Sequence, residues 1–184
     1  MEWESLAALE EEWKPVSRSA AITWLVFYLV FLIYALRARG GFLLIDHVNL
    51  VIHEGGHLLF GWLGATLGLW GGTLLELLVP LTLAIYFTFQ RQTIATAFAA
   101  YFFFENFLYV GTYMADARSQ GLPLVTVGDV ESGGHDWYRI FSSLGLLDHD
   151  RTIGGATRLL GFVGMVATIA WLAWRHRHQT SPAA

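Results

Sequence analysis

The sequence contains no cysteine and few charged residues. Without cysteine the chain can form neither a disulfide framework nor a thiolate metal site. Any bound metal therefore needs histidine, aspartate or glutamate ligands, a set that suits zinc or iron. Charged residues make up 14% of the 184 residues, compared with about 25% in typical soluble domains. The net charge of −4 offers no basic surface for nucleic acid, which excludes that class of partner. With 55% hydrophobic residues and a mean hydropathy of +0.48, the composition indicates a membrane protein.

Five apolar segments are each long enough to cross a bilayer, for which about 17 to 25 residues suffice. We therefore expect an all-α, polytopic membrane protein with five transmembrane helices, forming a single membrane domain over residues 1–184. Such a chain is a multi-pass protein of a plasma membrane or bacterial inner membrane, with the lipid bilayer as its surroundings. The expected spans are residues 20–36, 42–69, 73–89, 93–114 and 153–174; the first four occupy 20–115, and the fifth with its basic tail occupies 151–178.

Two polar stretches lie outside these spans. Residues 1–18 combine five glutamates with apolar residues at helical spacing, which predicts an amphipathic N-terminal helix at the membrane surface or a docking site for partner proteins. They lack the basic start and early apolar core of a secretory signal. Residues 116–150 form a polar loop, in which apolar residues at helical spacing after Asp136 predict a short amphipathic helix. With five spans, this loop emerges on the side of the membrane opposite to Arg37.

An H-E-x-x-H motif lies inside the second apolar segment. His53 and His57 are four residues apart, so on a helix both imidazoles project from one face and can bind one metal ion. Glu54 lies beside them and can act on a water molecule without being a ligand. Gly55 and Gly56 each reduce helix stability by about 1 kcal/mol relative to alanine. Because they lack side chains, however, they allow a neighbouring backbone to come close, and we expect such a contact here. The motif predicts a catalytic Zn²⁺ site with Glu54 as its catalytic residue.

The third metal ligand is left open by the sequence. Asp116 is the first candidate, because it ends the polar face of the fourth span, which also carries Asn106. His135, in the polar loop, is the second candidate. Asp136 and Glu76 rank behind these two candidates. Asp136 is equally explained as a helix cap, and Glu76 lies in the third span.

An intramembrane H-E-x-x-H helix, a return helix and a helix bearing asparagine and later aspartate resemble the core of site-2-protease-like intramembrane zinc metalloproteases. The resemblance runs from the second apolar segment to just beyond Asp116. It implies that His53, His57 and Asp116 bind zinc. It also implies that Glu54 is the general base and that Asn106 positions the substrate. The family motif N-x-x-P-x-P-x-x-D-G is not reproduced, because its prolines and final glycine are missing here.

These features predict an intramembrane zinc metallopeptidase that hydrolyses peptide bonds of a membrane protein or peptide in or near the membrane. A first alternative is a non-catalytic accessory or assembly subunit that retains the metal site, which the missing prolines and glycine favour. A second alternative is an ion or proton carrier that uses Asp46, His47, Glu76 and Glu105 as relay groups. Only the peptidase depends on Glu54, whereas the carrier depends on Asp46 and Glu105.

Overall fold

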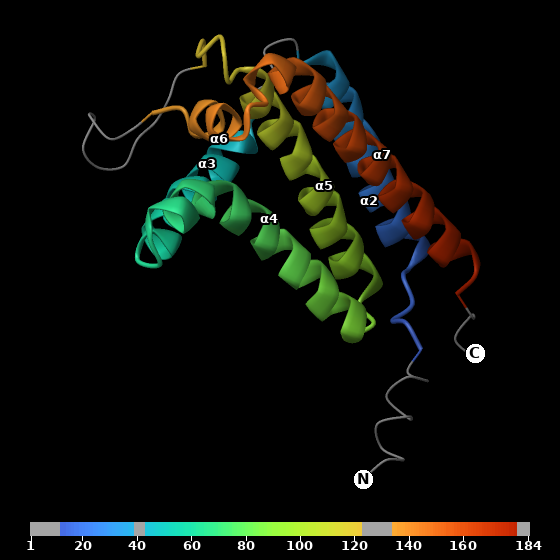
Figure 1. The fold of residues 1–184 in the computed structure, drawn as a ribbon. Helices are drawn as coiled ribbons and strands as arrows, with labels where there is room; N and C mark the ends of the chain where they lie inside the picture. The colour runs from blue at the N-terminus through green and yellow to red at the C-terminus, as the bar shows by residue number, and fades with distance from the viewer. Residues whose placement is uncertain (1–11, 39–42, 123–133, 180–184) are drawn as a thin grey trace.

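The computed structural model describes residues 12–38, 43–122 and 134–179, which form helices joined by turns (Figure 1). The expected all-α fold class is confirmed. In chain order the elements are α2 (Arg18–Arg37), α3 (Asp46–Gly61), α4 (Ala65–Phe89), α5 (Thr93–Ala115), α6 (Asp136–Leu144), the 3₁₀ helix η1 (Leu147–His149) and α7 (Asp150–Arg177).

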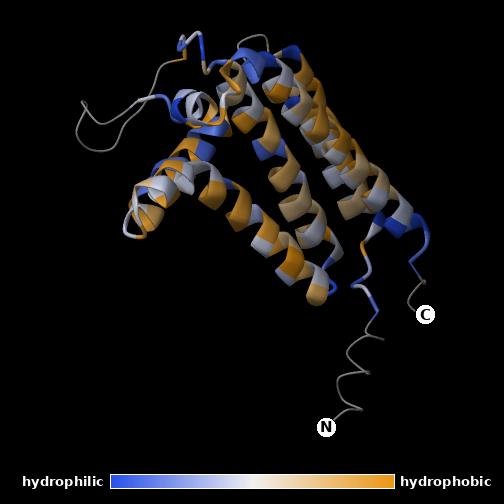
Figure 2. Cartoon of the chain, viewed as in Figure 1, coloured by the Kyte–Doolittle hydropathy of each residue, from blue (hydrophilic) through white to orange (hydrophobic). Residues whose placement is uncertain are grey.

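Four helical segments are long and apolar enough to cross a membrane, namely α2, α4, α5 and η1 with α7. Hydrophobic residues cover their middle parts, and hydrophilic residues gather near α6 and near the two termini (Figure 2). Large apolar side chains on their outer faces, including Val30, Leu83 and Val163, are exposed. Such a surface is compatible with an integral membrane protein, because lipid can cover it.

The expected second and third spans are corrected by the structure. The apolar run 42–69 is not one helix, because α3 ends at Gly61 and α4 begins at Ala65. Gly64 in the intervening turn has a φ of 115°, which glycine adopts without steric cost. With 16 residues, α3 is about 24 Å long, shorter than the hydrocarbon core of about 30 Å. The described residues therefore contain four candidate spans rather than five.

One end of the bundle holds the beginning of α2 and the end of α7, and we call it the terminal end. The Val16 N–H donates to Gln179 Oε1 at 2.7 Å, and Gln179 Nε2 donates to the Val16 carbonyl at 2.7 Å. The α4–α5 turn lies at the same end, since the Lys14 N–H donates to the Arg91 carbonyl at 2.9 Å. Helices α2 and α7 therefore run antiparallel.

The opposite end, which we call the site end, holds the end of α5, the beginning of α7 and helix α6 (Figure 1). There the Arg118 N–H donates to Asp150 Oδ2 at 3.2 Å. Because α2 also ends here, Arg37 lies at the same end as residues 116–122 and 134–150, the described parts of the polar loop, and not on the opposite side. The expectation was wrong because α3 turns back instead of crossing.

The expected amphipathic helix over residues 1–18 falls mostly outside the described residues. Residues 12–17 are not helical, and α2 begins at Arg18 after the N-cap Ser17, whose Oγ accepts the Ala20 N–H at 3.2 Å. The short helix expected after Asp136 is present as α6.

Helices α3 and α4 approach each other so closely that only glycine fits at their contact. A Cβ on Gly71 would lie 2.6 Å from the Gly56 carbonyl oxygen, and a Cβ on Gly72 would lie 2.5 Å from His53 Nε2. Both distances are shorter than van der Waals contact. Of the two glycines in the H-E-x-x-H motif, Gly56 therefore makes this contact, while Gly55 faces Leu75 at an ordinary distance of 3.9 Å.

Candidate metal centre

His53, His57 and Asp136 each offer one ligand atom, and these three atoms all lie within 4.8 Å of one another. Asp136 Oδ2 is 3.2 Å from His53 Nε2 and 3.1 Å from His57 Nε2. The histidines lie one turn apart on α3, whereas Asp136 is the first residue of α6. Within the described ranges, this is the group of histidine and carboxylate side chains that can hold a metal ion.

The second nitrogen of each imidazole is held by the protein. His57 Nδ1 lies 2.7 Å from the Gly68 carbonyl oxygen, which can only accept, so this nitrogen carries a proton. His53 Nδ1 lies 3.1 Å from Glu76 Oε2, and Glu76 is fully buried. Metal-binding histidines commonly donate their other ring N–H to a carbonyl or carboxylate in this way. In the neutral imidazoles, both Nε2 lone pairs then face Asp136.

This arrangement needs positive charge, which protons on the imidazoles or a metal cation can supply. Two Nε2 lone pairs and a carboxylate oxygen repel one another at these distances unless a proton or a cation lies between them. A metal cation satisfies all three groups at once. Two histidines and one carboxylate form a ligand set used for catalytic zinc and for non-haem iron. The donor set is therefore suited to a divalent metal ion.

The charge of Asp136 suits this role. When protons rather than a metal ion occupy the two Nε2 atoms, burial raises the pKa of Asp136, but hydrogen bonds from His53 and His57 outweigh this effect and lower that pKa to about 2. The carboxylate is therefore ionised at neutral pH, as a metal ligand must be. Tyr113 of α5 also contacts it: the Tyr113 hydroxyl accepts the Asp136 N–H at 3.1 Å and lies 3.5 Å from Asp136 Oδ2.

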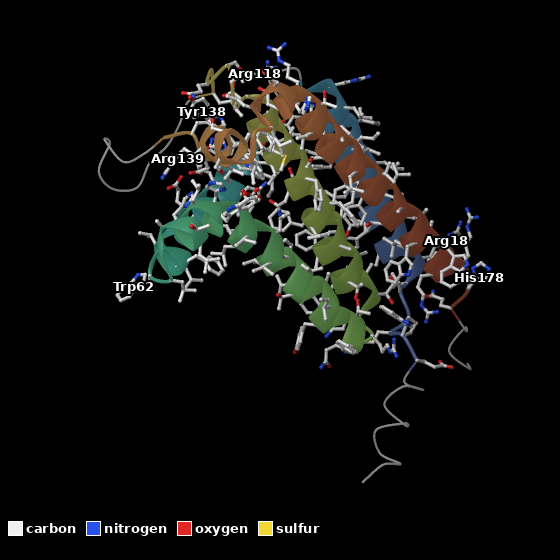
Figure 3. The ribbon with its side chains drawn as sticks, in the orientation of Figure 1. Arg18, Trp62, Arg118, Tyr138, Arg139 and His178 are labelled. Carbon is white, nitrogen blue, oxygen red and sulfur yellow. The ribbon has the colours of Figure 1, made fainter. Side chains whose placement is uncertain are left out.

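Helix α6 is seated on the bundle by buried apolar side chains. The Trp137 ring packs edge-on against Trp70 of α4, with ring centroids 5.6 Å apart. Ile140 and Phe141 are buried in the same cluster. The opposite side of α6 points outward, where Arg139 is visible beyond the bundle (Figure 3). The amphipathic pattern therefore fixes which side of α6 faces α3 and so aims Asp136 at the histidines.

Asp116, the first candidate for the third ligand, does not join the two histidines. Its Oδ1 accepts the Ser119 hydroxyl at 2.6 Å and the Gly121 N–H at 2.9 Å. Its Oδ2 accepts the Leu122 N–H at 2.9 Å. The carboxylate stabilises the turn that follows α5. Asp136, ranked behind it from sequence, occupies the position instead.

His135, the second candidate, is also absent from the group. It is the N-cap of α6, and its Nδ1 accepts the Tyr138 N–H at 3.2 Å. Its ring packs against Tyr113 with centroids 4.2 Å apart, and its Nε2 lies 3.5 Å from Asp116 Oδ2. From the sequence, Asp136 was explained as the helix cap. In the structure His135 takes that role, and the Asp136 carboxylate contacts His53 and His57.

The remaining predicted residues are Glu54, Asn106 and Glu76. Glu54 is partly buried on α3 and interacts electrostatically with Tyr109 and Tyr113 of α5. Asn106 is fully buried inside the bundle, where its Nδ2 donates to the Phe102 carbonyl at 3.2 Å. Glu76 supports His53 rather than joining the three ligand atoms.

Sequence reasoning missed two supporting groups, the Gly68 carbonyl and the Tyr113 hydroxyl. A backbone carbonyl carries no sequence signal. Tyr113 does carry one, because it lies seven residues after Asn106 on the polar face of α5.

A second buried polar cluster joins α3 to α5. Asn49 Nδ2 lies 3.1 Å from Asp46 Oδ1 and 3.1 Å from Glu105 Oε2. Asp46 and Asn49 are 0% exposed and Glu105 is 1% exposed. No ion pair to either carboxyl group occurs in the part of the chain that the structure describes. The Asn49 amide thus bridges the two acidic groups.

Comparisons of the chain with protein-family models, with curated proteins and with solved structures give no match. The functional conclusion therefore depends on the geometry of the centre formed by His53, His57 and Asp136.

Proposed function

We propose that the chain is a zinc-dependent intramembrane metallopeptidase similar to the site-2-protease type. The observation that carries this proposal is the convergence of His53 Nε2, His57 Nε2 and Asp136 Oδ2. The H-E-x-x-H spacing adds a glutamate beside the two histidines, which a purely structural metal site does not need. The supported Nδ1 atoms favour the same conclusion, since they orient both imidazoles for metal binding.

The residues have separate roles in this proposal. His53, His57 and Asp136 would hold zinc through three ligands, which leaves a further position open, as in other catalytic sites. When bound, zinc would supply Lewis-acid activation of water and of a peptide carbonyl group. The Glu54 carboxylate would accept the proton of the attacking water and deliver it to the departing amine.

The setting decides the class of substrate. Helices α2, α4, α5 and α7 would form a multi-pass bundle in a plasma membrane or bacterial inner membrane, with the metal centre toward its site end. Peptide groups of a transmembrane helix are protected by internal hydrogen bonds, so the substrate would have to unwind locally before attack. We therefore propose a membrane protein or membrane-bound peptide as substrate.

The test compares membranes from cells that produce the wild-type chain or Glu54→Gln. We expect new peptide termini, quantified by mass spectrometry, only with the wild type. Glu54→Gln should keep its metal, because Glu54 is not among the three ligand groups. An identical set of termini in both membranes would contradict a peptidase function and would leave the non-catalytic subunit as the better account.

A second candidate function is an ion or proton carrier, which the cluster of Asp46, Asn49 and Glu105 favours. Buried carboxyl groups in membrane segments are costly and usually mark function. If this function is correct, Asp46→Asn and Glu105→Gln should abolish proton flux into liposomes that contain the chain. Glu54→Gln should leave that flux unchanged, which separates the carrier from the peptidase.

A further inference from the structure

Two arginines from distant parts of the chain meet at one tryptophan at the terminal end. The guanidinium carbons of Arg91 and Arg175 each lie 5.6 Å from the centroid of the Trp13 ring. Trp171 of α7 packs edge-on against the same ring, with centroids 5.2 Å apart. We call these four residues the Trp13 cluster. It joins the segment before α2, the α4–α5 turn and the end of α7.

Hydrogen bonds hold the residues beside Trp13 against the α4–α5 turn and against the end of α7. The Lys14 N–H donates to the Arg91 carbonyl at 2.9 Å, and Thr93 Oγ1 donates to the Lys14 carbonyl at 2.8 Å. On the other side, Val16 exchanges two hydrogen bonds of 2.7 Å with Gln179. The position of Trp13 beside the two arginines is thus fixed by backbone hydrogen bonds and does not depend on the cation–π contacts alone.

Within the described ranges, no carboxylate pairs with either arginine. The Nε atoms of Arg91 and Arg175 are both buried without a hydrogen-bond partner. Among the residues with described positions, neither guanidinium forms an ion pair. At the site end, by contrast, Arg118 pairs with Asp150 at 2.7 Å. Two cations near one ring repel each other, and a bound anion would remove that repulsion.

Other residues at this end point to the membrane surface. Lys14, Arg18 and Arg177 are exposed here, and Arg18 and His178 lie at the same end of the bundle (Figure 3). Trp174 is 54% exposed beside them. Arginine and tryptophan at helix ends are typical of the layer in which lipid headgroups meet the hydrocarbon core.

We propose that the Trp13 cluster binds the phosphate group of an anionic phospholipid. Arg91 and Arg175 contact the phosphate, and the two indole rings lie at the boundary with the acyl chains. A lipid fits better than a free anion because the exposed apolar side chains of Phe89 and Trp174 adjoin the cluster at the ends of α4 and α7. The inference depends on membrane insertion but not on the metal centre or on peptidase activity.

The test measures binding of phosphatidylglycerol to the full chain in detergent by native mass spectrometry, with phosphatidylcholine as the uncharged-headgroup comparison. We expect wild type to prefer phosphatidylglycerol and the double variant Arg91→Gln/Arg175→Gln to bind it about thirty-fold more weakly, the effect of losing two interfacial charges. Arg91→Lys/Arg175→Lys keeps both charges and should retain most of the preference. That variant also shows whether the fold tolerates substitution at these positions.

The matched control is Arg37→Gln/Arg151→Gln, which removes two exposed charges at the site end. It should bind phosphatidylglycerol as the wild type does. Equal weakening in both double variants would overturn the proposal, because only total charge would then matter. Competition by inorganic phosphate at concentrations similar to those of the lipid would overturn it too, since the site would then take a free anion. His53→Ala should leave lipid binding unchanged, which separates this result from a failure of the metal site.

Discussion

The Nε2 atom of His57 lies 3.1 Å from Oδ2 of Asp136, although 79 residues separate them in the sequence. The contact joins α3, which carries the H-E-x-x-H motif, to α6, a short helix at the site end. The candidate metal centre therefore depends on how α6 docks. Three groups that could hold a metal ion meet at this junction, and each is oriented by further hydrogen bonds.

Glu76→Gln tests the support behind His53. The variant keeps the size of the side chain but removes the charge that holds the Nδ1 proton of His53. We expect zinc affinity to fall about 10- to 100-fold, as for other supporting residues of metal sites, when measured by competition with a chromogenic chelator. The control is Glu105→Gln, another buried glutamate, which bonds to Asn49 instead. An equal loss in both variants would indicate general destabilisation and contradict the specific role.

Gly72→Ala tests the close contact between α4 and the metal centre. The added methyl group would lie 2.5 Å from His53 Nε2, so either the imidazole or α4 must move. We expect a lower melting temperature and loss of metal. Gly155→Ala on α7 is the matched control, because nothing lies within 4 Å of its added Cβ. Alanine there should stabilise the chain by up to about 1 kcal/mol. Metal binding unchanged in Gly72→Ala would show that the contact is not needed.

Asp116→Asn tests the turn-stabilising role of Asp116. Burial raises the pKa of this carboxyl, but hydrogen bonds from Ser119, Leu122 and Gly121 outweigh it and lower the pKa below its ordinary value. The carboxylate therefore stabilises the fold above the unfolded pKa of about 4, and this contribution is lost as pH falls through the lower folded value. We expect the variant to be about 1 to 2 kcal/mol less stable at neutral pH.

Unfolding of wild type and Asp116→Asn, followed at several pH values in detergent, measures this difference. It should stay constant at neutral pH and shrink as pH falls below about 4. A difference that grows toward low pH would reverse the predicted sign and rule out this role of the carboxylate.

Much of the fold could be predicted from the sequence, because long apolar segments in a chain with so little charge leave few options other than membrane-length helices. The break in the second apolar segment could not be predicted, because the turn contains Trp62 and Leu63 and is therefore as apolar as the helices beside it. Trp62 is 93% exposed at this turn (Figure 3). In the structure the turn is marked by the positive φ of Gly64. In the sequence Gly64 is one glycine among many, which is not a sufficient signal for a turn.

The part of the candidate site that depends on spacing within one helix could be predicted from the sequence. The part that depends on how helices pack could not. His53 and His57 share a helix face by spacing alone. The third group depends on which face of α6 packs against α3 and α4, which a helical pattern in one segment cannot decide. Asp116 was favoured because it continues the polar face of α5, but backbone N–H groups of the following turn occupy its carboxylate.

We propose that His53, His57 and Asp136 form one metal site. The decisive measurement is the zinc content of the purified wild type, Asp136→Asn and Asp116→Asn, determined by elemental mass spectrometry in chelator-free detergent. We predict about one zinc per chain in the wild type and in Asp116→Asn, and little in Asp136→Asn. Zinc retained in Asp136→Asn but lost from Asp116→Asn, or no zinc in any of the three proteins, would contradict the account.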